Sequence, residues 1–153
     1  MRVLAVCLGN ICRSPAAEAA IAEAASRAGM SVEVDSAGTG AYHVGEPPDR
    51  RMRAAASRAG LEIDGRARQF QPDDFDRFDL IVVMDRSNLR DVVARAPDDR
   101  AAEKVRLFRT FDPQADPADL DVPDPYYGGD DGFRDVVAMV RRAAAGLIDE
   151  IER

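Results

Sequence analysis

Residues 2–15 read RVLAVCLGNICRSP, an apolar run followed by a short polar loop and then by a helix-start signal. The apolar run at the beginning of this segment is typical of a buried strand. Gly9 and Asn10 interrupt any periodic pattern in the loop. Ser14 is then a preferred N-cap residue, and Pro15 suits the first helical position. The segment therefore predicts a strand, a tight loop and a helix in direct succession.

Strand-like and helix-like segments alternate along the rest of the chain. Residues 80–84, LIVVM, form a continuous apolar run that is typical of a strand covered on both faces. Periodic segments that end at glycine or before proline predict helices. This alternation predicts an α/β fold, a four-stranded parallel sheet flanked by helices. The predicted strands are Arg2–Cys7, Ser31–Ser36, Leu80–Met84 and Lys104–Phe108, and the predicted helices are Ala16–Ala28, Asp49–Ala59, Pro72–Phe78, Arg86–Arg95 and Gly132–Ile151.

Length and charge narrow the class of protein. The 153 residues suit a single domain over residues 1–153. Lys and Arg number 21 against 28 Asp and Glu, a net charge of −7, whereas a general nucleic-acid binder carries a basic face. No apolar run approaches the roughly 18 residues of a membrane span, and the first residues lack a signal-peptide pattern. We expect a cytoplasmic protein without nucleic-acid or membrane partners; its oligomeric state is left open.

The loop after the first predicted strand carries the strongest chemical signal. In parallel sheets, ligands bind at the carboxyl ends of the strands. A loop this short can curl its backbone N–H groups inward, and the positive end of the next helix adds to the field. Such a nest suits a phosphate-sized dianion, to which Arg13 can offer a planar pair of donors. Cys7 would lie at its floor, where the same field lowers the pKa of a thiol.

Other residues of the loop fit the same interpretation. Gly9 permits close backbone approach, and Asn10 tolerates the left-handed conformation that shapes a curl. Ser14 can donate a hydrogen bond to a Cys7 thiolate. The alternative is that Cys7 is an ordinary buried strand residue and the loop an ordinary turn. The predicted phosphate-binding residues are Leu8, Gly9, Asn10, Ile11, Cys12 and Ser14.

Cleavage of a phosphate ester also needs an acid that protonates the leaving oxygen. Asp124 opens the segment DPYYGG at residues 124–129, where the rigid Asp-Pro step can hold a carboxylate over a pocket. Tyr126 and Tyr127 offer aromatic surface to a substrate ring. The alternative is that Asp124 is one of several solvated acids in the same loop. The only histidine, His43, is expected to be an exposed loop residue.

Motifs for metals and nucleotides are missing. Two cysteines and one histidine are too few for a convincing structural zinc site. The acidic loop before residue 130 lacks the residue order of a calcium loop. No Gly-x4-Gly-Lys-Ser/Thr segment occurs, and the glycines at 38–45 do not follow the dinucleotide-binding spacing. We therefore expect neither a metal nor a cofactor.

Taken together, the two chemical segments resemble the low-molecular-weight protein tyrosine phosphatases. The family pattern Val-Cys-x-Gly-Asn-Ile-Cys-Arg-Ser-Pro is found at residues 6–15, and Asp-Pro-Tyr-Tyr-Gly at residues 124–128. Residues 35–39 and 84–89 also look like family segments in the expected order. The resemblance covers nearly the whole chain. It implies hydrolysis of phosphotyrosine on protein through a cysteinyl-phosphate intermediate, without a metal.

The resemblance also implies individual roles. Cys7 attacks phosphorus, and Arg13 binds the phosphoryl oxygens and stabilises the transition state. Asp124 protonates the departing phenol and then activates the water that hydrolyses the intermediate. Ser14 stabilises the thiolate. The positions that wall the substrate cleft in the family are matched here by Tyr42, Tyr126 and Tyr127.

The same resemblance assigns support of the loop to Asn10 and Ser36. Many members of the family also carry a supporting histidine just before the segment seen here at residues 67–69. This chain has Gly65 at that place. The departure concerns the rigidity of the loop and leaves the chemistry of Cys7 unchanged.

Single residues bear on the other functions that the same fold could carry. Thioredoxin-coupled arsenate reductases use a further cysteine pair, and this chain has no cysteine after Cys12. A protein-arginine phosphatase remains an alternative, although such enzymes typically have threonine where this chain has Ile11. A non-catalytic phosphate-binding module is expected to have lost Cys7, Arg13 or Asp124. Cys12 also lies close enough in sequence to form a protective disulfide with an oxidised Cys7.

Overall fold

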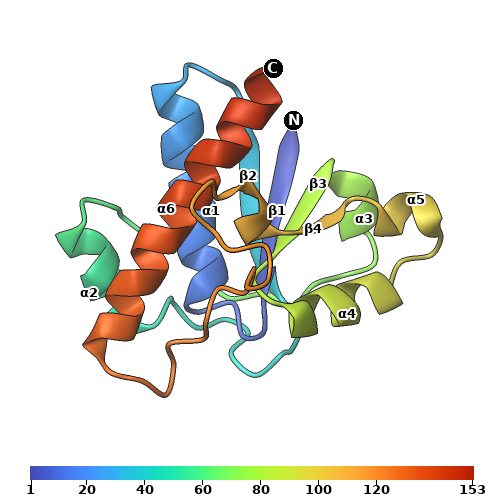
Figure 1. Cartoon of the computed structure of the whole chain (residues 1–153). Helices are drawn as coiled ribbons and strands as arrows, with labels where there is room; N and C mark the ends of the chain where they lie inside the picture. Colours follow the sequence, from blue (N-terminus) through green and yellow to red (C-terminus); the bar gives the residue numbers. More distant parts are fainter.

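The computed structural model describes residues 1–153 and has a parallel four-stranded sheet at its centre (Figure 1). The strands are β1 (Arg2–Cys7), β2 (Glu33–Gly38), β3 (Leu80–Val83) and β4 (Val105–Leu107), in the spatial order β2-β1-β3-β4. Every neighbouring pair is parallel. The carboxyl ends of all four strands therefore lie at one edge of the sheet. The predicted fold class, a four-stranded parallel sheet flanked by helices, is confirmed.

Helices cover both faces of this sheet (Figure 1). One face packs against α1 (Arg13–Arg27), α2 (Arg50–Arg58), α6 (Asp130–Glu152) and the 3₁₀ turn η1 (Phe108–Phe111). The other face packs against α3 (Asp74–Arg77), α4 (Arg86–Ala94) and α5 (Asp99–Ala102). No helix is both long and apolar enough to cross a bilayer.

The position of β1 in the sheet explains why its residues from Val3 onward are apolar. Its side chains alternate between the two faces, as in any strand. Val3 and Ala5 belong to the cluster under α1 and α6, whereas Leu4 and Val6 belong to the cluster under α3, α4 and α5. Both faces are buried from Val3 onward, so every strand residue after the exposed Arg2 is apolar. By the same alternation Cys7 faces the α1 side, at the carboxyl end of the strand.

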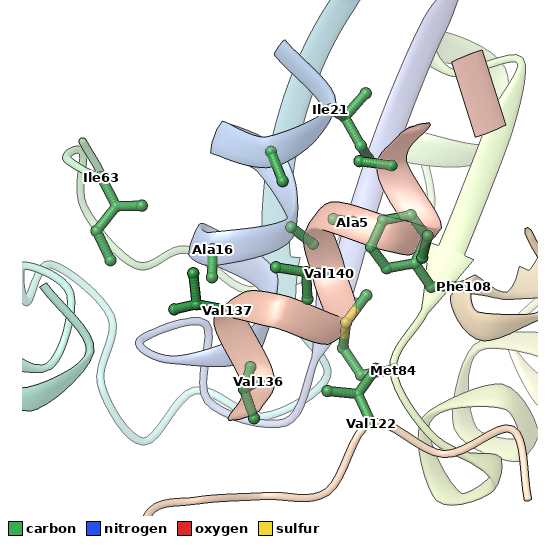
Figure 2. Packing of buried hydrophobic residues seen from close by; sticks show 14 of the residues in the cluster. Ala5, Ala16, Ile21, Ile63, Met84, Phe108, Val122, Val136, Val137 and Val140 are labelled. Atoms are coloured by element: carbon green, nitrogen blue, oxygen red, sulfur yellow. The ribbon is translucent and has the colours of Figure 1, made fainter. Parts of the chain in front are cut away.

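The packing of α6 on α1 joins two distant parts of the chain. Apolar residues of both helices, among them Ala16 and Val137, gather in one buried cluster that Figure 2 shows from close by. Gly146 brings α6 against η1, because a Cβ at this position would overlap the carbonyl oxygen of Phe111. The segment before α6 is thereby fixed above the edge of the sheet where β1 ends.

Two predicted boundaries differ from the structure at the start of α1 and in β2. The helix begins at Arg13 with Cys12 at the N-cap, and no side chain caps it. The prediction that Ser14 is the N-cap was therefore wrong. Strand β2 runs from Glu33 to Gly38, two residues later at both ends than the predicted Ser31–Ser36, because its parallel register with β1 extends from the pair Arg2 and Glu33 to the pair Cys7 and Gly38.

The later part of the chain contains elements that the sequence pattern did not indicate. Helix α5 is a single turn that starts at the side-chain cap of Asp98, and it was missed. The turn η1 follows β4 directly, where a strand end and a loop were predicted. Helix α6 begins at Asp130, two residues before the prediction. These differences leave the order of strands and major helices as predicted.

Candidate active site

The loop between β1 and α1, residues 8–12, is called the phosphate loop below. Its backbone is attached to the end of β2, because Thr39 N donates to Cys7 O at 2.8 Å and Gly40 N donates to Leu8 O at 3.0 Å. Gly38 makes this approach possible, since a Cβ there would lie 2.7 Å from the carbonyl oxygen of Leu8. The phosphate loop is thus held against the sheet edge by main-chain bonds.

Asn10 shapes the curl of the phosphate loop. With φ at 57° it is the one non-glycine residue with a positive φ. Its side chain is buried, its Oδ1 accepts from Arg68 N at 2.9 Å, and its Nδ2 donates to Ser14 Oγ and to Ser36 Oγ, each at 2.9 Å. An uncommon backbone conformation persists when its surroundings over-determine it, and these three bonds do so.

The Cys7 sulfur receives hydrogen bonds from two directions. It is 3 % exposed, lies 3.0 Å from Ser14 Oγ, and accepts from Asn10 N at 3.3 Å. Ser14 Oγ already accepts from Asn10 Nδ2, so its own proton is available for the sulfur, with Ala37 O as the other acceptor at 3.4 Å. The position of the Cys7 sulfur is thus set both by the phosphate loop and by the first turn of α1.

Backbone donors line the cleft above Cys7. The N–H groups of Leu8, Gly9, Ile11 and Cys12 have no acceptor within the protein. The first turn of α1 adds N–H groups that have no partner within the helix. The phosphate loop borders a cleft of ≈ 420 Å³ with Cys7 in its lining. Unpaired amides beside a helix N-terminus favour an anion here.

Arg13 is held from behind by two groups on other elements. It is 3 % exposed, and its Nη1 donates to Asp85 Oδ2 at 2.6 Å and to the carbonyl oxygen of Val122 at 3.0 Å. Burial disfavours the charged guanidinium, but Cys7 and Asp85 more than offset it and raise the pKa of Arg13. The side chain stays charged, and its Nε and Nη2 make no hydrogen bond within the protein, although Nη2 lies 3.7 Å from Asp124 Oδ2.

Asp85 is a site residue that sequence reasoning did not single out. Its Oδ1 caps α4 by accepting from Asn88 N at 2.7 Å, while its Oδ2 binds Arg13. The signal was present, because Asp85 follows β3 closely and so lies at the carboxyl edge of the sheet. Position alone did not show that its partner would be Arg13.

Asp124 lies in the segment between η1 and α6. The last part of this segment, residues 121–129, is called the acid loop below. Asp124 Oδ1 accepts from Tyr126 N at 3.1 Å, an Asx turn that sets the direction of the carboxylate. Its Oδ2 lies 3.7 Å from Arg13 Nη2, and its side chain is 43 % exposed. The structure therefore brings Asp124 and Cys7 to one cleft from opposite ends of the chain.

Aromatic side chains form the walls of the cleft. Tyr42, Tyr126 and Tyr127 all line it, and the rings of Tyr126 and Tyr127 meet edge to face with centroids 4.9 Å apart. His43 also lines the cleft, with its ring 6.1 Å from that of Tyr126 and its Nδ1 2.8 Å from Glu46 Oε2. His43 is thus a loop residue, as predicted, but it is half-buried, with 27 % of its side chain exposed.

The predicted site residues divide into two groups by position. Asn10, Ser14 and Ser36 lie behind the phosphate loop and are linked by the hydrogen bonds of Asn10. The second group lines the cleft: Cys7, Leu8, Gly9, Ile11, Cys12, Arg13, Tyr42, Asp124, Tyr126 and Tyr127.

Cys12 is a buried member of the second group. Burial raises the pKa of its thiol well above the usual range, so the thiol is protonated at neutral pH. The redox role of Cys12 stays a prediction.

Behind the phosphate loop, Glu18 completes the support. Ser36 Oγ donates to Glu18 Oε1 at 2.6 Å. A small cavity of ≈ 70 Å³ beside these groups is bordered by Gly65, and a Cβ on Gly65 would meet open space. Asn10 thus keeps all of its side-chain bonds without a side chain at position 65. Sequence reasoning missed Glu18, because nothing local marks it as a partner of Ser36.

Comparison with known proteins gives first the class and then the family. The crystal structure of a protein tyrosine phosphatase from Entamoeba histolytica matches with a TM-score of 0.95 and 38 % identity, over 99 % of this chain and 97 % of that one. A low molecular weight protein-tyrosine-phosphatase of Streptomyces coelicolor is 50 % identical over 149 residues, 96 % of this chain and 91 % of the relative. The low molecular weight phosphotyrosine protein phosphatase of Homo sapiens is 39 % identical over 151 residues, 97 % and 94 % of the two chains.

The family profile described as low molecular weight phosphotyrosine protein phosphatase matches residues 2–153. The chain therefore belongs to this family, whose activity is the hydrolysis of phosphotyrosine and whose substrates are phosphoproteins. The resemblance carried by residues 6–15 and 124–128 predicted this family and enzyme class, and both predictions are confirmed.

Proposed function

We propose that Cys7, Arg13 and Asp124 perform the hydrolysis of phosphotyrosine on protein in two steps, through a phosphate ester of Cys7. The observation that carries the proposal is the Cys7 sulfur, hydrogen-bonded by Ser14 and Asn10, in the lining of a cleft bordered by unpaired N–H groups. A thiolate in such a place is both stabilised and aimed at a bound phosphorus.

In the first step the Cys7 thiolate attacks phosphorus, and the bond from phosphorus to the phenolic oxygen breaks. Asp124 gives its proton to that oxygen, so that neutral tyrosine leaves. In the second step a water attacks the phosphocysteine, Asp124 takes a proton from the water, and the sulfur–phosphorus bond breaks. Inorganic phosphate and the Cys7 thiolate are released, and Asp124 is again protonated.

Stabilisation of the transition state falls to groups that are fixed before substrate binds. The equatorial oxygens of the transferring phosphoryl group spread charge outward, and preorganised donors aimed at them lower the barrier. The amides of the phosphate loop supply one set of donors. Arg13 supplies Nε and Nη2, because Asp85 and Val122 occupy its Nη1.

The cleft walls support phosphotyrosine as the preferred substrate. Tyr42, Tyr126 and Tyr127 can pack on a phenyl ring, and offset or edge contacts contribute about 0.5–1.5 kcal/mol per pair. Cys7 is buried at the floor, so a long side chain is needed to bring phosphate to the sulfur. Phosphoserine is too short to place its phosphate there while its backbone stays outside.

A cytoplasmic location is part of the proposal. The mechanism needs Cys7 as a free thiolate, and a reducing compartment keeps it so. Both Cys7 and Cys12 are free thiols in the structure. Fractionation of cells followed by activity assays on each fraction tests this; activity outside the cytoplasmic fraction would contradict it.

The test of the mechanism is the variant Cys7→Ser. It is expected to lose turnover of a phosphotyrosyl peptide while still binding inorganic phosphate, since the amides and Arg13 remain. Rapid acid quench of the wild-type enzyme with ³²P-labelled substrate is expected to trap label on Cys7. Substantial turnover by Cys7→Ser, or label on another residue, would overturn the assignment.

A further inference from the structure

Arg51, in the first turn of α2, bridges the phosphate loop and the acid loop. Its Nη2 donates to the carbonyl oxygen of Tyr126 at 2.9 Å. Its guanidinium also lies over the ring of Tyr126, 5.4 Å from the centroid, and over the ring of Phe133 at 4.6 Å. One side chain therefore contacts both the main chain and the ring of Tyr126, and the first turns of α6.

The other side of the bridge is Asp49, the N-cap of α2. Arg51 Nε and Nη2 meet the two oxygens of Asp49 at 3.3 Å and 3.2 Å, which is a two-point ion pair. Asp49 N in turn donates to the carbonyl oxygen of Ile11 at 2.7 Å. Burial raises the pKa of Asp49, but hydrogen bonds from Arg51 outweigh it and lower the pKa, so the pair stays charged at neutral pH.

The peptide groups of Tyr126 connect this bridge to the acid. Tyr126 N donates to Asp124 Oδ1, and Tyr126 O accepts from Arg51. A continuous path of bonds thus runs from Ile11 through Asp49, Arg51 and Tyr126 to the Asp124 carboxylate. Before Asp124 the acid loop is fixed by the buried Val122, whose N donates to Met84 O at 2.7 Å. After Asp124, Pro125 is buried, but Tyr127 and the glycines that follow it are exposed, so Arg51 is the side chain that holds the Tyr126 peptide.

We propose that Arg51 is a positioning residue that sets the Asp124 carboxyl over the phosphate loop. It acts through Tyr126 and does not touch the reacting atoms. The inference rests on the proposed function, in which Asp124 is the leaving-group acid. Loss of Arg51 leaves Cys7, Arg13, the amides and the Val122 anchor in place but releases the Tyr126 peptide that orients Asp124. A displacement of about 1 Å at a reacting group can cost on the order of 10²-fold in rate.

The experiment compares two esters that differ in their need for an acid. Phenyl phosphate has a poor leaving group, whereas p-nitrophenyl phosphate leaves readily without a proton. Arg51→Gln is expected to lower kcat/KM for phenyl phosphate by roughly 10- to 100-fold, and for p-nitrophenyl phosphate much less. Competitive inhibition by inorganic phosphate is expected to stay unchanged, because the phosphate loop is intact.

Two further variants serve as matched comparisons. Arg53→Gln removes the same charge from an exposed position on the same helix, and both esters are expected to react as with the wild type. Arg51→Lys keeps the charge opposite Asp49 but lacks the fork that reaches Asp49 and Tyr126 together. Its loss on phenyl phosphate is expected to lie between those of the wild type and Arg51→Gln.

The outcomes separate this inference from the proposed function. If Asp124→Asn shows no preference between the esters, the assignment of the acid fails, whatever Arg51 does. If Asp124→Asn discriminates but Arg51→Gln affects both esters equally or neither, the positioning role is overturned. Should Arg51→Gln not fold, the same comparison on Arg51→Lys decides. In the double variant, Arg51→Gln is expected to add no discrimination to Asp124→Asn.

Discussion

Arg13 and Asp85 form a 2.6 Å ion pair that joins the first turn of α1 to the N-terminus of α4. Asp85 uses one oxygen for Arg13 and the other for the backbone of its own helix. The orientation of the arginine is therefore set by a helix that contributes nothing else to the cleft lining. Substrate does not have to order this side chain on binding, so no reorganisation cost is added when charge develops in the transition state.

Asp85→Asn is expected to weaken both stability and catalysis. The amide keeps an acceptor for the α4 cap but removes the carboxylate nearest to the buried Arg13, which retains only Asp124 at 3.7 Å. Breaking a buried pair costs about 3–5 kcal/mol, and the retained cap places the loss at the low end. Urea unfolding measures the loss of stability, and kcat/KM for a phosphotyrosyl peptide measures the loss of catalysis. Asp91→Asn, on the exposed side of α4, is the control. Unchanged values in both assays would contradict a role for the pair.

Asp124→Asn is expected to reduce kcat/KM for phosphotyrosine by roughly 10²–10⁴, the usual contribution of general acid catalysis. Esters of acidic phenols are expected to lose much less, since they leave unprotonated. Asp119→Asn, an exposed acid in the segment before α6, is the control for a simple charge effect. Equal losses on both substrate types, or an equal effect of Asp119→Asn, would show that Asp124 is only a solvated acid.

Ile11→Thr is expected to shift substrate choice. Ile11 lines the cleft and is mostly buried, so its apolar side chain favours a phenyl ring over a guanidinium. The hydroxyl of threonine suits a polar leaving group. Paired turnover measurements on phosphotyrosyl and phosphoarginyl peptides are expected to favour phosphotyrosine strongly in the wild type, and less in the variant. A wild type that preferred phosphoarginine would overturn the substrate assignment and leave the role of Cys7 intact.

Glu18→Gln is expected to change the pH dependence of stability. Burial, with help from Asp35 and Asp64, raises the pKa of Glu18 against the opposing effects of Ser36 and Arg68. The fold therefore favours the protonated carboxyl. The contribution of Glu18 to stability is fully present below the pKa of the unfolded chain, and it is lost as the pH rises through the raised pKa of the folded state.

Glutamine keeps an acceptor for Ser36 and removes the titration. Urea unfolding is expected to show Glu18→Gln as more stable than the wild type at pH 7, with the difference vanishing below about pH 4. Turnover is expected to change little, because the Asn10 bonds remain. A variant that is less stable than the wild type at every pH would show that the charge of Glu18 supports the fold.

The fold was predictable because its elements are marked locally. A continuous apolar run identifies β3, and the apolar face of α6 recurs at helical spacing. Ser14 shows where such reasoning failed. A serine before a proline is a good local cap, but here its hydroxyl bonds Cys7 and Asn10 instead, and the helix already begins at Arg13. Tertiary partners prevailed over a local preference.

The same division holds for the site. Cys7, Arg13 and Asp124 were found because each lies in a short motif whose chemistry can be inferred from neighbouring residues. Asp85 and Arg51 were not, because their meaning comes from partners far along the chain, such as Tyr126 75 residues from Arg51. No pattern within a window of sequence carries that information.

The packing of α6 on α1 also determines when the protein becomes an enzyme during its own synthesis. The nucleophile leaves the ribosome long before the acid, the Val122 carbonyl that steadies Arg13, and the helix that covers α1, all of which come after residue 121. Contacts between distant segments form late, once both have been made. An unfinished chain therefore carries Cys7 without catalytic competence, and phosphatase activity appears only when translation has passed through α6.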